Sequence, residues 1–230
     1  MDIGKAFTFV FDDKDWIVKI LIAAGITLVG IVFFWLIIPP FLAAFVLSGY
    51  GVEITRRVIR GDAEVLPAWE DWGAFFTDGL KVFVIGIVYA LPIIAVSICL
   101  GIPAGILSDN GESAASAFSA LLSCINFLWG IVMAFLLPAA IASFVAKDDM
   151  AAAFRFGDVF ALVRDNFVTY LLVAVLSWVA SIIGGLGLLV CGVGVLVTAP
   201  YATWVTNFLY GAAYVEATGQ APPVLEEEFA

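Results

Sequence analysis

The sequence contains no histidine, and only 13% of its 230 residues are charged. Histidine is the commonest general base near neutral pH and a frequent zinc ligand, so its absence removes the usual route to both kinds of chemistry. The motifs of serine hydrolases, zinc proteases and P-loop enzymes do not occur either. The sequence therefore argues against an enzyme, and it predicts no catalytic, cofactor-binding or metal-binding residue.

Positive charge is also scarce, with 10 Lys and Arg against 20 Asp and Glu. Binding to nucleic acid requires clustered cations that neutralise phosphates, so no nucleic-acid partner is predicted. The three cysteines are Cys99, Cys124 and Cys191. Their odd number and their apolar surroundings predict small buried side chains rather than a disulfide framework.

Apolar residues dominate the chain, at 63% of the sequence and a mean hydropathy of +1.11. Soluble domains carry about 45–50% apolar residues, and a chain this short cannot bury such an excess in its own core. The excess lies in continuous apolar runs, which is typical of helices that span a membrane and not of alternating barrel strands. The sequence therefore predicts an all-α polytopic membrane protein.

Six apolar runs approach the roughly 20 residues that a helix needs to cross a bilayer. We predict a single membrane domain over residues 1–219, followed by an acidic C-terminal tail over 220–230. The predicted spans are 17–38, 41–59, 80–102, 118–146, 167–184 and 195–214.

The basic residues predict the direction of the spans. All of them fall before the first span, between spans two and three, or between spans four and five, when the span ends that border these segments are counted with them. Basic residues concentrate on the cytoplasmic side of membrane proteins, so both termini are predicted to lie in the cytoplasm and the protein in the cell membrane. The basic residues are Lys5, Lys14, Lys19, Arg56, Arg57, Arg60, Lys81, Lys147, Arg155 and Arg164.

The sequence also predicts an internal repeat. Amphipathic segments rich in aromatic residues precede spans one, three and five, and each ends in an acidic residue before the chain enters the membrane. The residues Pro40, Tyr50 and Gly51 recur at the same spacing as Pro200, Tyr210 and Gly211. We therefore predict three units, about 1–61, 62–150 and 151–219, each an interfacial helix on the cytoplasmic side followed by a transmembrane hairpin.

Two groups of residues are candidates for contacts. Glu53 precedes Arg56 and Arg57 by three and four residues, a helical spacing that predicts ion pairs. Lipid headgroups or a protein partner are predicted to contact basic and aromatic residues near the inner interface. These residues are Arg56, Arg57, Arg60, Trp69 and Trp72.

The second group consists of neutral polar residues inside the predicted spans. No charged residue lies in the middle of a predicted span. Coupled carriers usually keep buried charges, so a proton or sodium relay is not predicted. The polar residues Asn126, Asn207, Tyr50 and Tyr210 are instead predicted to bond neighbouring helices or to line a path for an uncharged molecule.

The run from Arg56 to Asp62, the segment LPAWEDWG over 66–73, and DGLK over 78–81 together resemble the signature of the "domain of unknown function 4013" family. The opening IGKAFTFVFDDKDWIVKILI is similar to the start of that family as well. The resemblance implies a multi-pass membrane protein of archaea or bacteria, and it implies no activity.

Two classes of function stay open. The first is a non-enzymatic protein that organises the lipid bilayer or scaffolds a membrane-protein partner or a second copy of itself. The second is a permease or channel for a neutral or lipidic substrate, which requires a cavity between the repeat units.

Overall fold

The computed structural model describes residues 2–108, 112–189 and 192–219, and every regular element in these ranges is helical, as predicted. The predicted tail over 220–230, Cys191 and residues 109–111, which fall between the third and fourth predicted spans, lie outside the described residues. The long helices are α1 (Ile3–Asp12), α2 (Trp16–Val32), α3 (Ile38–Arg60), α4 (Trp72–Ser108), α5 (Glu112–Lys147), α7 (Phe156–Asp165), α8 (Phe167–Leu186) and α9 (Val195–Thr218). The short ones are α6 (Met150–Ala153) and the 3₁₀ turns η1 (Phe34–Leu36) and η2 (Gly187–Leu189).

Local signals in the sequence explain where the helices begin and end. The side chain of Asp2 caps α1 by accepting a hydrogen bond from the backbone N–H of Lys5 at 3.1 Å. Helix α3 carries prolines in its first turn, where no backbone N–H is needed. It ends at Gly61, whose φ of 76° lies in the left-handed region that favours glycine.

Four helical segments in the described residues are long and apolar enough to cross a membrane: Ile38–Arg60, Trp72–Ile102, Ser116–Lys147 and Phe167–Leu189. Helices α1 and α2 form a fifth candidate only if they are counted together as one span, although they meet at a bend of 93°. These segments indicate a membrane protein. Helix α9 is not among them, so the prediction of six spans stays a prediction.

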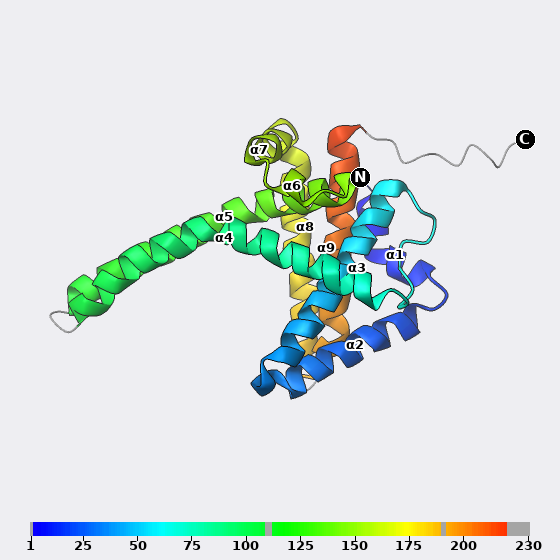
Figure 1. Ribbon diagram of the computed structural model, residues 1–230, viewed down its shortest axis with the longest axis horizontal. Coiled ribbons are helices and arrows are strands. Elements are labelled where there is room, and N and C mark those ends of the chain that lie inside the picture. Colours follow the sequence, from blue (N-terminus) through cyan, green and yellow to red (C-terminus); the bar gives the residue numbers. More distant parts are fainter. Residues whose placement is uncertain (1, 109–111, 190–191, 220–230) are drawn as a thin grey trace, which may run out of the picture.

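Helix α9 lies at the centre of the body of the molecule (Figure 1). It contacts α1, α2, α3, α5 and α8, and more of its residues are buried than in the other helices of the body. A helix surrounded by protein does not need the continuous apolar surface that lipid demands, which explains why α9 is less apolar than α2 and α8.

Glycines allow α3 to approach α4 backbone to backbone. A Cβ atom on Gly49 would lie 1.7 Å from the carbonyl oxygen of Phe75 in α4, and a Cβ on Gly79 of α4 would lie 1.8 Å from the carbonyl oxygen of Phe45 in α3. The contact is reciprocal, because each helix presents a glycine to the backbone of the other. Small residues commonly permit such close packing between membrane helices.

The opposite face of α3 packs against α9 in a similar way. A Cβ on Gly51 would lie 2.4 Å from the side-chain nitrogen of Asn207, and a Cβ on Gly211 would lie 2.9 Å from the carbonyl oxygen of Thr55. The hydroxyl of Thr55 also donates a hydrogen bond to the carbonyl oxygen of Asn207 at 2.9 Å. The two glycines that recur in the sequence thus both serve the contact between α3 and α9.

Helices α4 and α5 run side by side and extend far beyond the body (Figure 1). We call residues 90–102 and 116–137 the arm, and none of their side chains is buried. Its residues Phe127 and Ile102 are 71% and 61% exposed. The prediction of buried cysteines is wrong for Cys99 and Cys124, because both are exposed on the arm.

Separate helices precede the predicted spans in two of the three units, as α1 and α7, while their place at a membrane interface stays a prediction. Helix α7 is separate, and its Phe156 and Phe160 are 52% and 59% exposed. The second helix is not separate, because the chain from Trp72 continues through Asp78 into α4 without a break. No proline or left-handed residue interrupts this stretch, so the helix does not end.

The first interfacial helix, α1, differs from the prediction in what it covers. Its buried residues are Ala6, Phe9 and Val10. The ring of Phe9 stacks on that of Phe208 of α9 with centroids 4.7 Å apart, and the hydroxyl of Tyr201 donates to the carbonyl oxygen of Phe7 at 2.7 Å. The apolar face of α1 therefore packs on protein and not on lipid.

Candidate functional site

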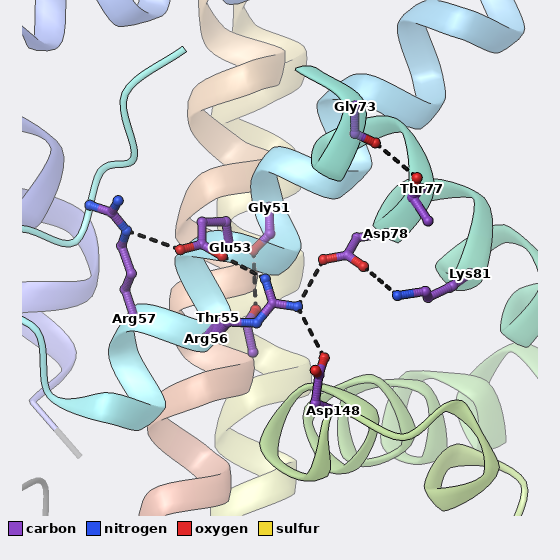
Figure 2. A network of polar contacts seen from close by, with 10 residues as sticks. All are labelled: Gly51, Glu53, Thr55, Arg56, Arg57, Gly73, Thr77, Asp78, Lys81 and Asp148. Carbon is purple, nitrogen blue, oxygen red and sulfur yellow. Dashed lines mark hydrogen bonds and ion pairs between the residues drawn. The ribbon is translucent and has the colours of Figure 1, made fainter. Parts of the chain in front are cut away.

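A network of charged side chains lies at the end of α3, where the base of α4 and the turn after α5 meet it (Figure 2). The predicted ion pairs within α3 are confirmed. A guanidinium nitrogen of Arg56 lies 2.5 Å from Glu53 Oε2, and Arg57 Nε lies 3.2 Å from Glu53 Oε1. Glu53 thus holds both arginine side chains against the helix.

Arg56 also bridges to the other two elements. Its Nη2 lies 2.8 Å from Asp78 Oδ2 in α4 and 3.8 Å from Asp148 Oδ1 in the turn after α5. The other oxygen of Asp78 accepts a hydrogen bond from Lys81 at 2.8 Å. We call Glu53, Arg56, Arg57, Asp78, Lys81 and Asp148 the charged network.

Burial determines how much each ion pair of the charged network contributes to the stability of the fold. The side chains of Arg56 and Asp78 are only 15% and 11% exposed, whereas that of Asp148 is 80% exposed. Breaking a buried pair by removing one partner typically costs about 3–5 kcal/mol, because the remaining charge is left uncompensated. The pair of Arg56 and Asp78 therefore fastens the base of α4 to α3, while the contact with Asp148 is exposed to solvent and weak.

Arg57 and Trp69 fasten the loop between α3 and α4. Arg57 donates to the carbonyl oxygens of Glu64 and Leu66 at 3.0 and 3.3 Å. The indole N–H of Trp69 donates to the carbonyl oxygen of Lys19 at 3.1 Å, and its ring stacks on Tyr50 with centroids 4.2 Å apart. Both residues are thus engaged within the chain.

The predicted contact residues therefore divide into two groups. Arg56, Arg57 and Trp69 make internal contacts, whereas Arg60 and Trp72 are exposed. Arg60 and Trp72 are the members of the set whose side chains are most open to a headgroup or a partner.

Tyr50 is a buried member of the second predicted group. It is fully buried between Trp69 and Trp204, and its hydroxyl donates to the carbonyl oxygen of Pro67 at 2.9 Å. Its role in the structure is to pack helices and to hold the loop.

Asn207 and Tyr210 lie together at a pocket of about 240 Å³. We call it the neutral pocket, since no charged side chain lines it. It lies where α3, α4, α5, α8 and α9 meet. Its lining residues are Ser48, Val52, Val82, Ile141, Ser181, Ala202, Thr203, Thr206, Asn207 and Tyr210.

Asn126 does not reach this pocket. It is exposed on the arm, and its side-chain nitrogen donates to the carbonyl oxygen of Leu122 in its own helix at 2.8 Å. The structure therefore brings together two of the four predicted neutral residues.

Sequence reasoning missed two features: the ion pair between Arg56 of α3 and Asp78 of α4, and the place of Ser48 in the lining of the neutral pocket. The spacing of Asp78 and Lys81 predicts that these two lie close together, but no sequence pattern assigns Arg56 as their partner across helices.

In the part of the chain that the structure describes, no three His, Cys, Asp or Glu side chains gather into a group that could hold a metal ion.

Comparison with known proteins gives one match. The model of the family described as "Protein of unknown function (DUF4013)" matches residues 32–193, which is more than half of the chain and includes the signature over 56–81. The opening segment over 3–22 lies outside the matched residues, so its resemblance to the start of the family stays a prediction. No curated protein and no solved structure is significantly similar to the chain.

Proposed function

We propose that this chain, which belongs to the family described as "Protein of unknown function (DUF4013)", is a non-enzymatic protein of the cell membrane that organises lipid or scaffolds a membrane partner. In this proposal the chain spans the membrane six times as three hairpins, with both termini in the cytoplasm. The distribution of the basic residues supports that orientation.

One observation carries the proposal: the arm exposes a long apolar surface that none of the described residues outside it covers. No charged residue occurs over 82–108 or 113–146. Helix α4 has 37 residues and is about 55 Å long at about 1.5 Å per residue, which exceeds the roughly 30 Å of hydrocarbon in a bilayer. A surface of this kind requires lipid or another membrane protein around it.

The charged network supports the same function. It fastens the base of α4 to α3, so the arm is attached rigidly and presents its surface in a defined direction. A scaffold needs such a rigid attachment, because a flexible hairpin would lose conformational entropy on binding.

The experiment that tests this function places a photo-crosslinking amino acid at Phe127 of the arm in cells. We expect discrete adducts with lipid or with one membrane protein. The matched control is the same amino acid at Phe34, which is equally exposed at 71% but lies in the turn between α2 and α3. Adducts at Phe127 that are no more discrete or abundant than those at Phe34 would argue against a scaffold.

A second candidate function, a permease for a neutral or lipidic substrate, is supported by the neutral pocket. Residues from all three predicted units line it, and transporter sites commonly lie at the interface between repeats. Proteoliposomes should then take up an uncharged polyol faster than empty liposomes do, and equal rates would exclude this function for that substrate.

A further inference from the structure

The neutral pocket is open to the surroundings of the protein, because Ser181 and Thr203 in its lining are exposed, and its hydroxyl groups differ in how their hydrogen bonds are used. The hydroxyls of Thr203, Thr206 and Ser181 each donate to a backbone carbonyl oxygen one turn earlier, at 3.0, 2.9 and 2.8 Å. Each of these oxygens therefore keeps lone pairs that can accept a hydrogen bond but has no proton left to donate.

Two further hydroxyls in the pocket can both donate and accept a hydrogen bond. Ser48 and Tyr210 make no hydrogen bond to any of the described residues. Asn207 has used one amide proton, in a bond to the carbonyl oxygen of Thr203 at 2.9 Å. Ser48 and Tyr210 can thus donate to a ligand, while the three hydroxyls of α8 and α9 can accept from it.

The remaining lining restricts the ligand further. Val52, Val82, Ile141 and Ala202 supply apolar lining beside these polar groups. No charged side chain is available to compensate an ion, so an anion or a cation would pay the full cost of leaving water. The occupant that fits is uncharged and carries both hydroxyl or ester oxygens and hydrocarbon.

Size gives the last restriction. The volume of about 240 Å³ lies below the roughly 300–1,000 Å³ typical of pockets for drug-sized ligands. A fragment of about the size of glycerol fits, whereas a whole sugar chain or a nucleotide does not.

We propose that the neutral pocket binds the glycerol moiety of an uncharged molecule, either free glycerol or a neutral glycerolipid, with Ser48 and Tyr210 donating hydrogen bonds to its oxygens. The site does not depend on transport, because a scaffold that holds a lipid and a permease that moves a solute would both use it.

The test measures binding directly, in detergent free of glycerol. Free glycerol is followed by saturation-transfer difference NMR and monoolein by native mass spectrometry, with glycerol 3-phosphate as the charged comparator. We expect saturable binding of at least one neutral probe and at least about tenfold weaker binding of the phosphate, because the pocket holds no cation. The probe that binds more tightly identifies the source of the moiety.

Conservative variants locate the site. Tyr210→Phe and Ser48→Ala each remove one donor and should weaken binding about fivefold, which is the effect of one ordinary hydrogen bond. Thr206→Val, which removes an acceptor at nearly constant volume, should also weaken it. Tyr89→Phe and Ser123→Ala are the matched controls, since both hydroxyls lie outside the pocket and donate to backbone carbonyls.

The proposal is overturned if neither neutral probe binds saturably, if the phosphate binds equally well, or if the pocket variants bind like the controls. Its failure is distinguishable from failure of the scaffold, because photo-crosslinking at Phe127 reports on the arm and not on the pocket.

Discussion

The body and the arm both contain strongly apolar helices, such as α8 in the body and α5 in the arm, yet these helices pack differently. In the body, α3 meets α4 and α9 through glycines, and side chains such as Trp204 and Leu209 are fully buried. In the arm, a Cβ added to Gly130 would meet no other segment of the described chain within 4 Å, and no side chain is buried. Hydrophobicity alone therefore does not tell a helix that packs on protein from one that faces its surroundings; the placement of small residues does.

Glycine substitutions should give the largest contrast between the two regions. Gly49→Ala places a Cβ against the backbone of Phe75 and should lower the free energy of unfolding by more than about 4 kcal/mol, or prevent folding. Gly130→Ala on the arm meets open space and should be neutral or stabilise by up to about 1 kcal/mol. Unfolding in mixed micelles, followed by tryptophan fluorescence, measures both, and equal effects would contradict the comparison.

Aromatic truncations should differ nearly as much. Phe208 is 6% exposed and stacks on Phe9, so Phe208→Ala should cost about 3–5 kcal/mol. Phe127→Ala on the arm should change the stability by no more than about 0.5 kcal/mol. The same unfolding assay applies, and a large loss for Phe127→Ala would mean that the arm is packed in the folded protein.

The charged network should show an intermediate effect at the junction of body and arm. Arg56→Met leaves Asp78 with Lys81 as its remaining partner, so we expect a loss of about 2–3 kcal/mol, below that of a fully orphaned buried charge. Arg60→Met is the control and should be nearly neutral. Adding Asp78→Asn to Arg56→Met should cost little more, and full additivity of the two losses would show that the pair does not couple α3 to α4.

The smallest effect is expected at the contact between α3 and α9. Thr55→Val removes the hydrogen bond to the carbonyl oxygen of Asn207 and should cost about 0.5–1.5 kcal/mol. Thr77→Val is the control, because its exposed hydroxyl donates only to the carbonyl oxygen of Gly73 in its own helix. A loss of stability for Thr55→Val no larger than that of the control would show that this hydrogen bond does not stabilise the contact between α3 and α9.

The sequence predicts the approximate bounds of several helices but not the contacts between them. The predicted spans 41–59 and 167–184 correspond to Ile38–Arg60 and Phe167–Leu186, because hydrophobic runs and helix-ending glycines are local signals. The pairs within α3 could be predicted for the same reason. The close approach of Gly49 and Gly79 joins residues from different helices, and no local pattern encodes which glycines will meet.

The candidate site shows the same limit. Asn207 and Tyr210 could be identified as neutral polar residues within a span, but Ser48 and the gathering of all three beside one pocket depend on how five helices cross. Asn126 carries the same local signal as Asn207 and lies on the exposed arm. A polar residue in an apolar run is thus a candidate whose role is decided by its tertiary neighbours.

The exposure of the arm is tested most directly by spin labels at its native cysteines, Cys99 and Cys124, in nanodiscs with Cys191 replaced by serine. The account predicts that both labels are mobile and relaxed strongly by oxygen, which partitions into lipid, and weakly by a water-soluble nickel complex. Immobile labels that neither reagent reaches would show that the hairpin of α4 and α5 is packed inside the protein, and would contradict the division into body and arm.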